Sequence, residues 1–116
     1  MTQSGTAART RIVHLKRCGE AKALMRKKVP LARRVLGEGH EITLKMRWVY
    51  AQSFYEDDGA TLDDLREAVT TLEDTLRAAR RVLGGTHPIV ANIEHRLLKS
   101  RAKLRAREAP PPPGTA

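Results

Sequence analysis

Two histidines stand at matching places in the sequence, so metal binding is the first chemistry to consider. His40 and His87 are 47 residues apart, and each follows a glycine-containing segment. A shared zinc ion would need both imidazoles about 2 Å from the metal. If the two histidines belong to two copies of a repeated unit, as the sequence match described below indicates, their side chains lie one repeat apart. We therefore expect no metal site.

The remaining candidate for covalent catalysis is the single cysteine, and the sequence gives it little support as a nucleophile. Cys18 lies between Arg17 and Gly19, where a nearby cation favours the thiolate. A cysteine nucleophile also needs a general base, and the sequence places no histidine beside it. The chain contains no G-x-S-x-G, H-E-x-x-H, Walker or Rossmann motif. We therefore expect a non-catalytic protein without a cofactor.

Four glycines, at positions 37, 39, 84 and 85, are a candidate phosphate cradle at a helix start. Their equivalent places in the chain favour a structural role instead, as the points where one helix stops and the next begins.

All the aromatic residues lie within eight positions, from Trp48 to Tyr55. Helical spacing places Tyr50 and Phe54 in the core and puts Trp48 and Tyr55 on a different face. Packing in the core or between repeats is favoured over an exposed recognition patch, and both interpretations stay open.

The basic charge is unevenly distributed. The chain has 22 Lys and Arg against 13 Asp and Glu, and its net charge is +9. Residues 1–36 carry +9, residues 37–76 carry −7 and residues 77–116 carry +7. Since neither basic block contains an aromatic residue, base stacking is disfavoured. Attraction to a phosphate backbone is the only mode of nucleic-acid binding that this pattern supports.

Length and composition bound the remaining possibilities. The 116 residues suffice for one modest domain, and a single cysteine excludes an intrachain disulfide and favours the cytoplasm. No apolar stretch approaches the length of a membrane span. Residues 1–18 are a basic N-terminal segment, either frayed or, less favoured, an organellar targeting sequence. Residues 108–116, with four consecutive prolines, are expected to form a disordered tail.

An internal repeat is the strongest signal in the chain. Residues 32–40 read ARRVLGEGH and residues 79–87 read ARRVLGGTH, so seven of nine positions match at an offset of 47. Ile42 and Ile89 extend the match. A fixed offset of this size indicates duplicated structural units.

The repeat predicts four helices. Apolar residues spaced 3 and 4 apart predict a helix over residues 62–83, with Thr61 as N-cap and Gly84-Gly85 as stop. A second helix begins near Pro88. The earlier copy predicts a helix from about Ile42 to Asp58-Gly59. The apolar stripes comprise Leu62, Leu65, Val69, Leu72, Leu76, Ala79 and Leu83; then Val90, Ile93, Leu97, Ser100 and Leu104; and, in the earlier copy, Ile42, Met46, Val49 or Tyr50, and Phe54.

A further helix is predicted from Glu20 to Leu36, equivalent to residues 62–83. Pro30 lies inside it and is expected to kink it or delay its start. The helical repeat domain then covers residues 19–107, with repeat junctions near 37–40 and 84–87.

The unit ARRVLGxxHP, in which one helix ends at Val-Leu-Gly and the next opens at His-Pro, resembles the tetratricopeptide-like repeats of the kinesin light chain type. This resemblance implies an all-α fold, in which antiparallel helix pairs stack as a short tetratricopeptide-like solenoid. The offset of 47 exceeds the usual 34, and we place the excess in residues 56–61. Where that family carries paired asparagines, this chain has Trp48 and Val49, then His95 and Arg96.

These features predict a non-catalytic interaction scaffold that binds a protein or peptide partner. The alternative is a basic helical protein that binds nucleic acid or another anionic surface. A third interpretation, based on the small number of repeats, is self-association by stacking with another copy. The candidate partner-binding residues are Arg47, Trp48, Tyr55, His95, Arg96 and Lys99. The alternative would use Arg26, Lys27, Lys28, Arg33, Arg34, Arg101, Lys103, Arg105 and Arg107.

Overall fold

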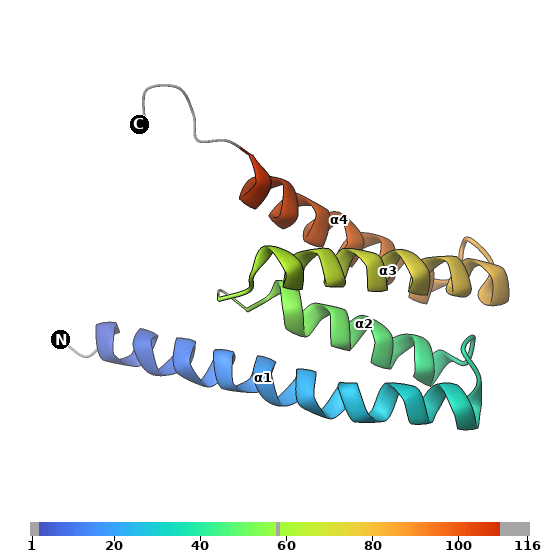
Figure 1. Ribbon diagram of the computed structural model, residues 1–116, viewed down its shortest axis with the longest axis horizontal. Coiled ribbons are helices and arrows are strands. Elements are labelled where there is room, and N and C mark those ends of the chain that lie inside the picture. Colours follow the sequence, from blue (N-terminus) through green and yellow to red (C-terminus); the bar gives the residue numbers. More distant parts are fainter. Residues whose placement is uncertain (1–2, 58, 110–116) are drawn as a thin grey trace.

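The computed structural model of the chain describes residues 3–57 and 59–109, and it describes side chains from Gly19 onward. These residues form helices and connections without any strand, so the expected all-helical class is confirmed. Figure 1 shows that the chain reverses direction at each connection between helices. The helices are α1 (Gln3–Leu36), α2 (Glu41–Tyr55), α3 (Leu62–Leu83) and α4 (Pro88–Glu108).

A glycine with positive φ ends α1 and α3 in the same way. Gly37 has φ 94° and Gly84 has φ 86°, a region that side chains other than glycine rarely occupy. The N–H of Gly37 donates to the carbonyl of Arg33, and that of Gly84 donates to the carbonyl of Arg80, both at 3.1 Å. The repeated sequence therefore produces a repeated helix stop.

The two histidines cap the helices that follow. His40 and His87 share the backbone angles φ −67° and ψ 140°. In each, Nδ1 accepts a hydrogen bond of 3.1 Å from the backbone N–H two residues later, of Ile42 and Ile89 respectively. Each imidazole thus satisfies one of the N–H groups that a helix start leaves without a partner.

The equivalence continues along α2 and α4, beyond the matching sequence. Ser53 and Ser100, which are 47 residues apart, are both buried. Ser53 Oγ donates to the carbonyl of Tyr50 at 2.5 Å, and Ser100 Oγ donates to that of Leu97 at 3.0 Å. Two helices that share little sequence here therefore satisfy their buried hydroxyls alike.

Helix α3 has the predicted bounds and the predicted cap. Thr61 Oγ1 accepts from the N–H of Asp64, and the Asp64 carboxylate accepts from the N–H of Thr61, each at 3.1 Å. This reciprocal capping box satisfies two donors at the helix start. Four of the seven predicted stripe residues, Leu65, Leu72, Leu76 and Ala79, are buried.

Helix α2 departs from the predicted single stripe. Ile42 is 47% exposed, whereas Leu44 and Ala51 are fully buried. The reason is that α2 contacts α1, α3 and α4, so more than one of its sides is covered. The helix also ends at Tyr55, earlier than expected, and Asp57 Oδ1 accepts from the N–H of Gly59 at 2.9 Å in the following turn.

Helix α1 is longer than predicted. It begins at Gln3 instead of Glu20 and continues through Pro30. The prediction that this proline delays the start of the helix is therefore wrong. Between Gln3 and Pro30 the sequence has no other proline and is rich in Ala, Arg, Leu and Lys, which are strong helix formers. The proline run of the predicted tail lies outside the described residues.

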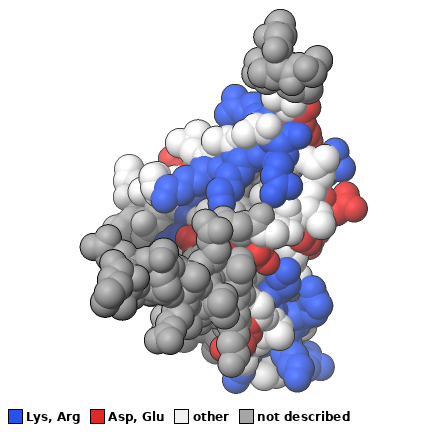
Figure 2. Space-filling view, turned by 90° about the vertical axis from the view of Figure 1, so that its left-hand side faces the viewer, with Lys and Arg blue, Asp and Glu red and all other residues white. Residues whose placement is uncertain are grey.

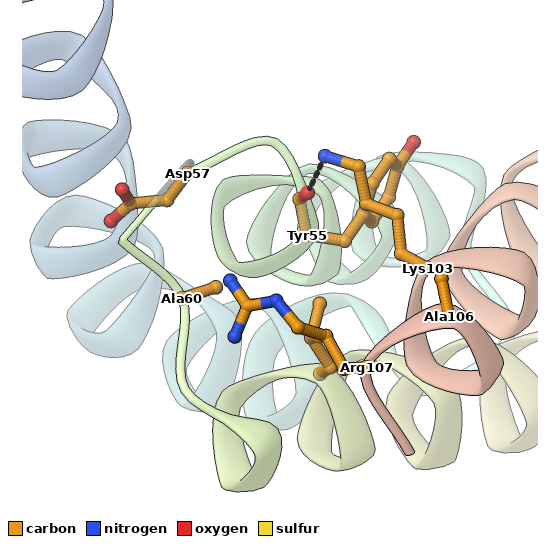
Figure 3. Close-up of a pocket in the computed structure, with 7 residues that line it drawn as sticks. Tyr55, Asp57, Ala60, Lys103, Ala106 and Arg107 are labelled. Carbon is orange, nitrogen blue, oxygen red and sulfur yellow. Dashed lines mark hydrogen bonds between the residues drawn. The ribbon is translucent and has the colours of Figure 1, made fainter. Parts of the chain in front are cut away.

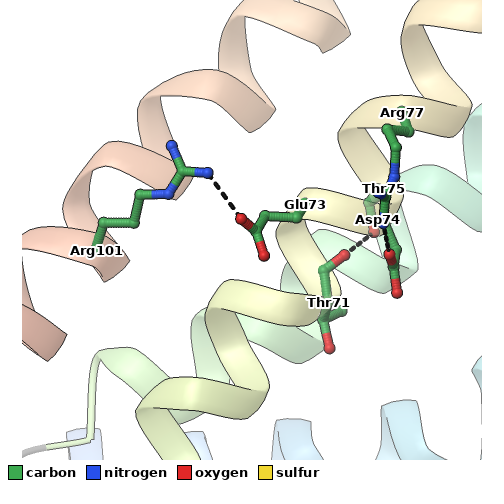
Figure 4. Close-up of polar contacts among 6 residues, drawn as sticks. All are labelled: Thr71, Glu73, Asp74, Thr75, Arg77 and Arg101. Carbon is green, nitrogen blue, oxygen red and sulfur yellow. Dashed lines mark hydrogen bonds and ion pairs between the residues drawn. The ribbon is translucent and has the colours of Figure 1, made fainter.

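The main buried cluster is formed by α2, α3 and α4, and Val29 and Ala32 of α1 are buried as well. Polar contacts also join α4 to α3. Leu65 and Leu72 of α3 pack in one buried cluster with residues such as Ile93 of α4. Figure 4 shows Arg101 of α4 reaching Glu73 of α3, at an N–O distance of 2.8 Å. Such an exposed pair contributes only about 0–1 kcal/mol, so burial of apolar side chains dominates this interface.

Replacing Gly84 by alanine should destabilise the fold, because its φ of 86° and ψ of 157° strain any residue with a Cβ. We expect Gly84→Ala to lower the free energy of unfolding by about 1–3 kcal/mol. Gly85→Ala is the matched control, since Gly85 lacks a positive φ and has open space around it. Urea unfolding followed by circular dichroism measures both, and equal losses would contradict this account of the junction.

Candidate partner-binding site

The side-by-side packing of α2 and α4 brings three of the six candidate residues together. Arg96 Nη1 donates to Gln52 Oε1 at 2.6 Å and to the Tyr55 hydroxyl at 3.5 Å. The guanidinium carbon of Arg96 lies 5.3 Å from the ring centroid of Trp48, within the range of a cation–π interaction. Trp48, Tyr55 and Arg96 therefore form one cluster, which we call the α2–α4 site.

Lys103 extends this cluster toward the end of α2. Its ammonium donates to the backbone carbonyl of Tyr55 and lies 6.0 Å from the centroid of that ring. Figure 3 shows this lysine reaching across from α4 to the carbonyl. Because the last carbonyls of a helix lack partners within it, a lysine there satisfies an acceptor and the helix dipole together.

A small cavity adjoins Lys103 at the same end. Its volume is about 260 Å³, and Tyr55 and Leu65 lie on its wall. Lys103 and Arg107 line it from α4, and Asp57 lines it from the connection that follows α2 (Figure 3). The cavity continues the α2–α4 site with a mainly basic border.

The other candidate residues occupy different surroundings. His95 and Lys99 are exposed on α4, where a partner can reach them. Arg47 is only 4% exposed and lines a separate cavity that also involves α1 and α3. Tyr55 is 3% exposed, so its ring serves as a packed wall of the site. A binding role for any of the six stays a prediction.

Gln52 was not predicted, and Lys103 was predicted only for the alternative function, binding to an anionic surface. Both had a signal in the sequence, because Gln52 lies four residues after Trp48 and Lys103 lies four after Lys99. Such spacings place side chains on one face of a helix. The sequence did not show that α2 and α4 contact each other, so it could not bring these two side chains into one site.

The chemistry of the site is recognition by cations, hydrogen-bond donors and aromatic rings. Arg96 Nε is buried and has no hydrogen-bond partner among the described residues, which leaves one donor of this guanidinium unsatisfied. In the part of the chain that the structure describes, no three His, Cys, Asp or Glu side chains are grouped so as to hold a metal. None of the described helices combines the length and apolar character needed to cross a bilayer.

Burial of the Tyr55 phenol raises its pKa above the usual value of 10.0, although the hydrogen bond and charge of Arg96 act in the opposite direction. The chain has two tyrosines, so Tyr50→Phe leaves Tyr55 as its only phenol. We expect the tyrosinate absorbance of this variant near 295 nm to rise with a midpoint above pH 10 in the folded protein. In guanidinium chloride the midpoint should return to about 10.

The sign of the linked stability effect follows from this shift. Because the folded state holds the proton more tightly, this contribution is complete below the unfolded pKa and is lost as the pH rises through the folded pKa. The free energy of unfolding of Tyr50→Phe should therefore fall more steeply above pH 10 than that of the Tyr50→Phe/Tyr55→Phe double variant. Equal slopes would contradict the raised pKa.

Comparison with protein families, with curated proteins and with solved structures finds no match for this chain. A relationship to tetratricopeptide-like repeats therefore stays a prediction from the chain's own residues.

Proposed function

We propose that this chain is a non-catalytic interaction scaffold built from tetratricopeptide-like repeats of the kinesin light chain type, with helix pairs stacked as a short solenoid. The supporting observation is the helix junction that occurs twice, with the same glycine stop and the same histidine cap. In that family, the helix that opens at His-Pro faces the peptide groove. The corresponding helices here are α2 and α4, which contact each other.

The α2–α4 site supports a protein or peptide partner with acidic character. Arg96, Lys99 and Lys103 follow one another at spacings of three and four along α4, which places them on one side of this helix. Figure 2 looks onto the end of the molecule where α4 finishes, and a band of Lys and Arg side chains crosses the upper part of that view. Such a row attracts acidic segments and accelerates their association.

The aromatic residues would supply an anchor for the same partner. Trp48 is half-buried beside Arg96, and its position holds an asparagine in the family. A tryptophan offers a large apolar surface where the family offers an amide, so we expect an aromatic or aliphatic contact there. The partner that fits best is an acidic peptide with one large apolar side chain.

The alternative, binding to nucleic acid or another anionic surface, uses the basic residues of α1 and of the end of α4. Part of this charge is already paired within the chain. Arg33 Nε lies 2.9 Å from a Glu38 oxygen, and Arg101 is paired with Glu73. Exposed pairs of this kind are weak and exchangeable, so salt-dependent binding decides between the two functions. A cytoplasmic location remains part of the proposal for either.

The proposed function predicts that a fluorescent decapeptide with several glutamates and one tryptophan binds more tightly than the same peptide with lysines in place of the glutamates. Lys99→Glu should weaken the binding of the acidic peptide roughly five- to tenfold, which corresponds to about 1–1.4 kcal/mol of binding free energy. Trp48→Ala should also weaken it. Arg81→Glu makes the same charge change on the exposed side of α3 and should have little effect.

Fluorescence anisotropy at two salt concentrations measures these affinities, and circular dichroism checks that each variant is folded. A single-stranded RNA and a DNA duplex of 20 nucleotides are titrated in parallel. If only the nucleic acids bind, with a steep loss of affinity as salt rises, the alternative function is correct. If neither class of ligand binds at low salt, both proposals fail.

A further inference from the structure

A cavity of about 210 Å³ lies between α1, α2 and α3, and it is not part of the α2–α4 site. Three arginines line it, Arg26 and Arg33 from α1 and Arg47 from α2. Glu67 is the acidic residue on its wall. The charge of the lining side chains is therefore positive, and Val29 adds an apolar surface to the same wall.

Arg47 is a buried cation whose hydrogen-bonding capacity is largely unused. Its side chain is among the buried charged groups, and neither Nε nor Nη1 has a hydrogen-bond partner among the described residues. Burial and the charge of Arg33 lower the pKa of Arg47, while Glu38 and Asp74 raise it. An arginine in a protein nevertheless keeps its charge at neutral pH.

Glu38 and Asp74 compensate the charge of this guanidinium in part, but among the described residues no group accepts a hydrogen bond from its Nε or Nη1. Residues 1–18 contain no Asp or Glu, so that segment has no carboxylate to contribute. Buried polar groups normally have partners, and a buried unpaired charge is more costly still. Nε and Nη1 of Arg47 are thus donors, held in a cavity, that lack an acceptor among the described residues.

We propose that this cavity is an anion-binding site for the carboxylate group of a small organic acid. A guanidinium presents parallel N–H donors that match the two oxygens of a carboxylate. Arg26 and Arg33 add positive potential around the entering group, and Val29 and Tyr50 offer contact to its carbon chain. The carboxylate belongs either to a free acid or to a Glu or Asp side chain of a partner.

Thermal unfolding with sodium succinate tests the site, at an ionic strength held constant with sodium chloride. The melting temperature of the wild-type chain should rise, by roughly 5–10 °C when succinate reaches ten times its Kd. Arg47→Met removes the charge and keeps most of the stem. This variant should melt no lower than wild type without succinate and should lose the response to it. Arg77→Met, on the exposed side of α3, should respond as wild type does.

A second measurement covers the case in which Arg47→Met does not fold. In the wild-type chain, the Nε–H resonance of Arg47 should shift on titration with succinate and saturate. A capped Gly-Glu-Gly peptide, titrated in the same way, distinguishes a partner side chain from a free acid. If succinate and the peptide leave both the melting temperature and this resonance unchanged, or if Arg47→Met responds as wild type does, the site is overturned.

A second inference depends on the repeat itself and concerns the two ends of the helix stack. On α1, Leu24, Leu31 and Val35 are 48%, 48% and 69% exposed. Their spacing of seven and four places them on one side of the helix, and we call them the α1 row.

The equivalent residues of α3 lie toward the pair of helices α1 and α2. At an offset of 47 they are Thr71, Ala78 and Val82. Ala78 is buried, and Thr71 lines a cavity together with residues of α2. Val82 is 54% exposed, less than its counterpart Val35, and it lies so close to Gly39 of the α1–α2 connection that a Cβ on that glycine would come within 2.5 Å of it. The α1 row is therefore the open counterpart of an interface that the chain already contains.

Helix α4 exposes the complementary surface. Leu98 is 62% exposed, and Ala91 and Ala102 are exposed as well. We call these three residues the α4 row. Their equivalents in α2 are Leu44, Ala51 and Tyr55, all of which are buried in the core shared with α3 and α4.

We infer that the chain self-associates head to tail, with the α4 row of one copy covering the α1 row of the next. This contact repeats the packing of α3 on α2. Because the two surfaces differ, a dimer still has one open α1 row and one open α4 row, so it can add further copies.

Sedimentation velocity from 10 to 500 µM tests the inference with two charge substitutions. The weight-average mass of wild type should rise continuously with concentration. Leu31→Glu and Leu98→Glu should each be monomeric alone, but an equimolar mixture should form a one-to-one dimer, because one row of each kind survives. Ile42→Glu, at an exposed apolar residue outside both rows, should behave as wild type.

The outcomes separate the ways in which this surface could be used. If Leu98→Glu associates as wild type does, the contact joins two α1 rows and the head-to-tail arrangement is wrong. If wild type stays monomeric throughout, or if the mixture fails to pair while wild type associates, the inference is also overturned.

Discussion

The helix junction of Gly and His is the constraint on which the rest of this structure depends. A glycine at positive φ ends α1 and α3, and a histidine side chain caps the following helix within four residues. Since the backbone angles of His40 and His87 agree, α2 and α4 begin with the same local geometry. Some equivalent positions then meet similar surroundings, as the paired hydrogen bonds of Ser53 and Ser100 show. Others do not, since Ile42 is 47% exposed and Ile89 only 6%. The repeated nine-residue segment thus sets the local geometry at both of these helix junctions.

How far the sequence predicts the fold depends on how many neighbours a helix has. For α3, the cap at Thr61 and the stop at Gly84 predicted both ends, and for α4, Pro88 predicted the start. Apolar spacing predicted much of the buried side of each helix, although α3 also buries Ala68 and Ala78, because it packs against both α2 and α4. The same method failed for α2, which is covered by three helices, so that Leu44 is buried and Ile42 is not. A periodic pattern identifies one buried side, but it does not state how many helices will cover the others.

The candidate site shows the same limit in its polar residues. Trp48 and Arg96 could be selected from their departure from a family pattern, and they do meet. The burial of Arg47 was beyond sequence analysis, because arginines on amphipathic helices normally lie in solvent. Only the approach of α1 and α3 to the same side of α2 encloses it. The contact of Lys103 with the Tyr55 carbonyl also depends on where α2 ends. The sequence prediction placed that end too late, near Asp58-Gly59.

The net charge of +9 has opposite consequences for the two kinds of contact inferred here. A carboxylate or an acidic peptide is attracted by it, and added salt weakens that attraction. Two copies that stack head to tail repel each other through the same charge, so added salt should favour stacking until screening is complete. The apolar rows of α1 and α4 must overcome that repulsion. The chain is therefore expected to meet acidic partners first at low ionic strength, and its own copies more readily as salt and concentration rise.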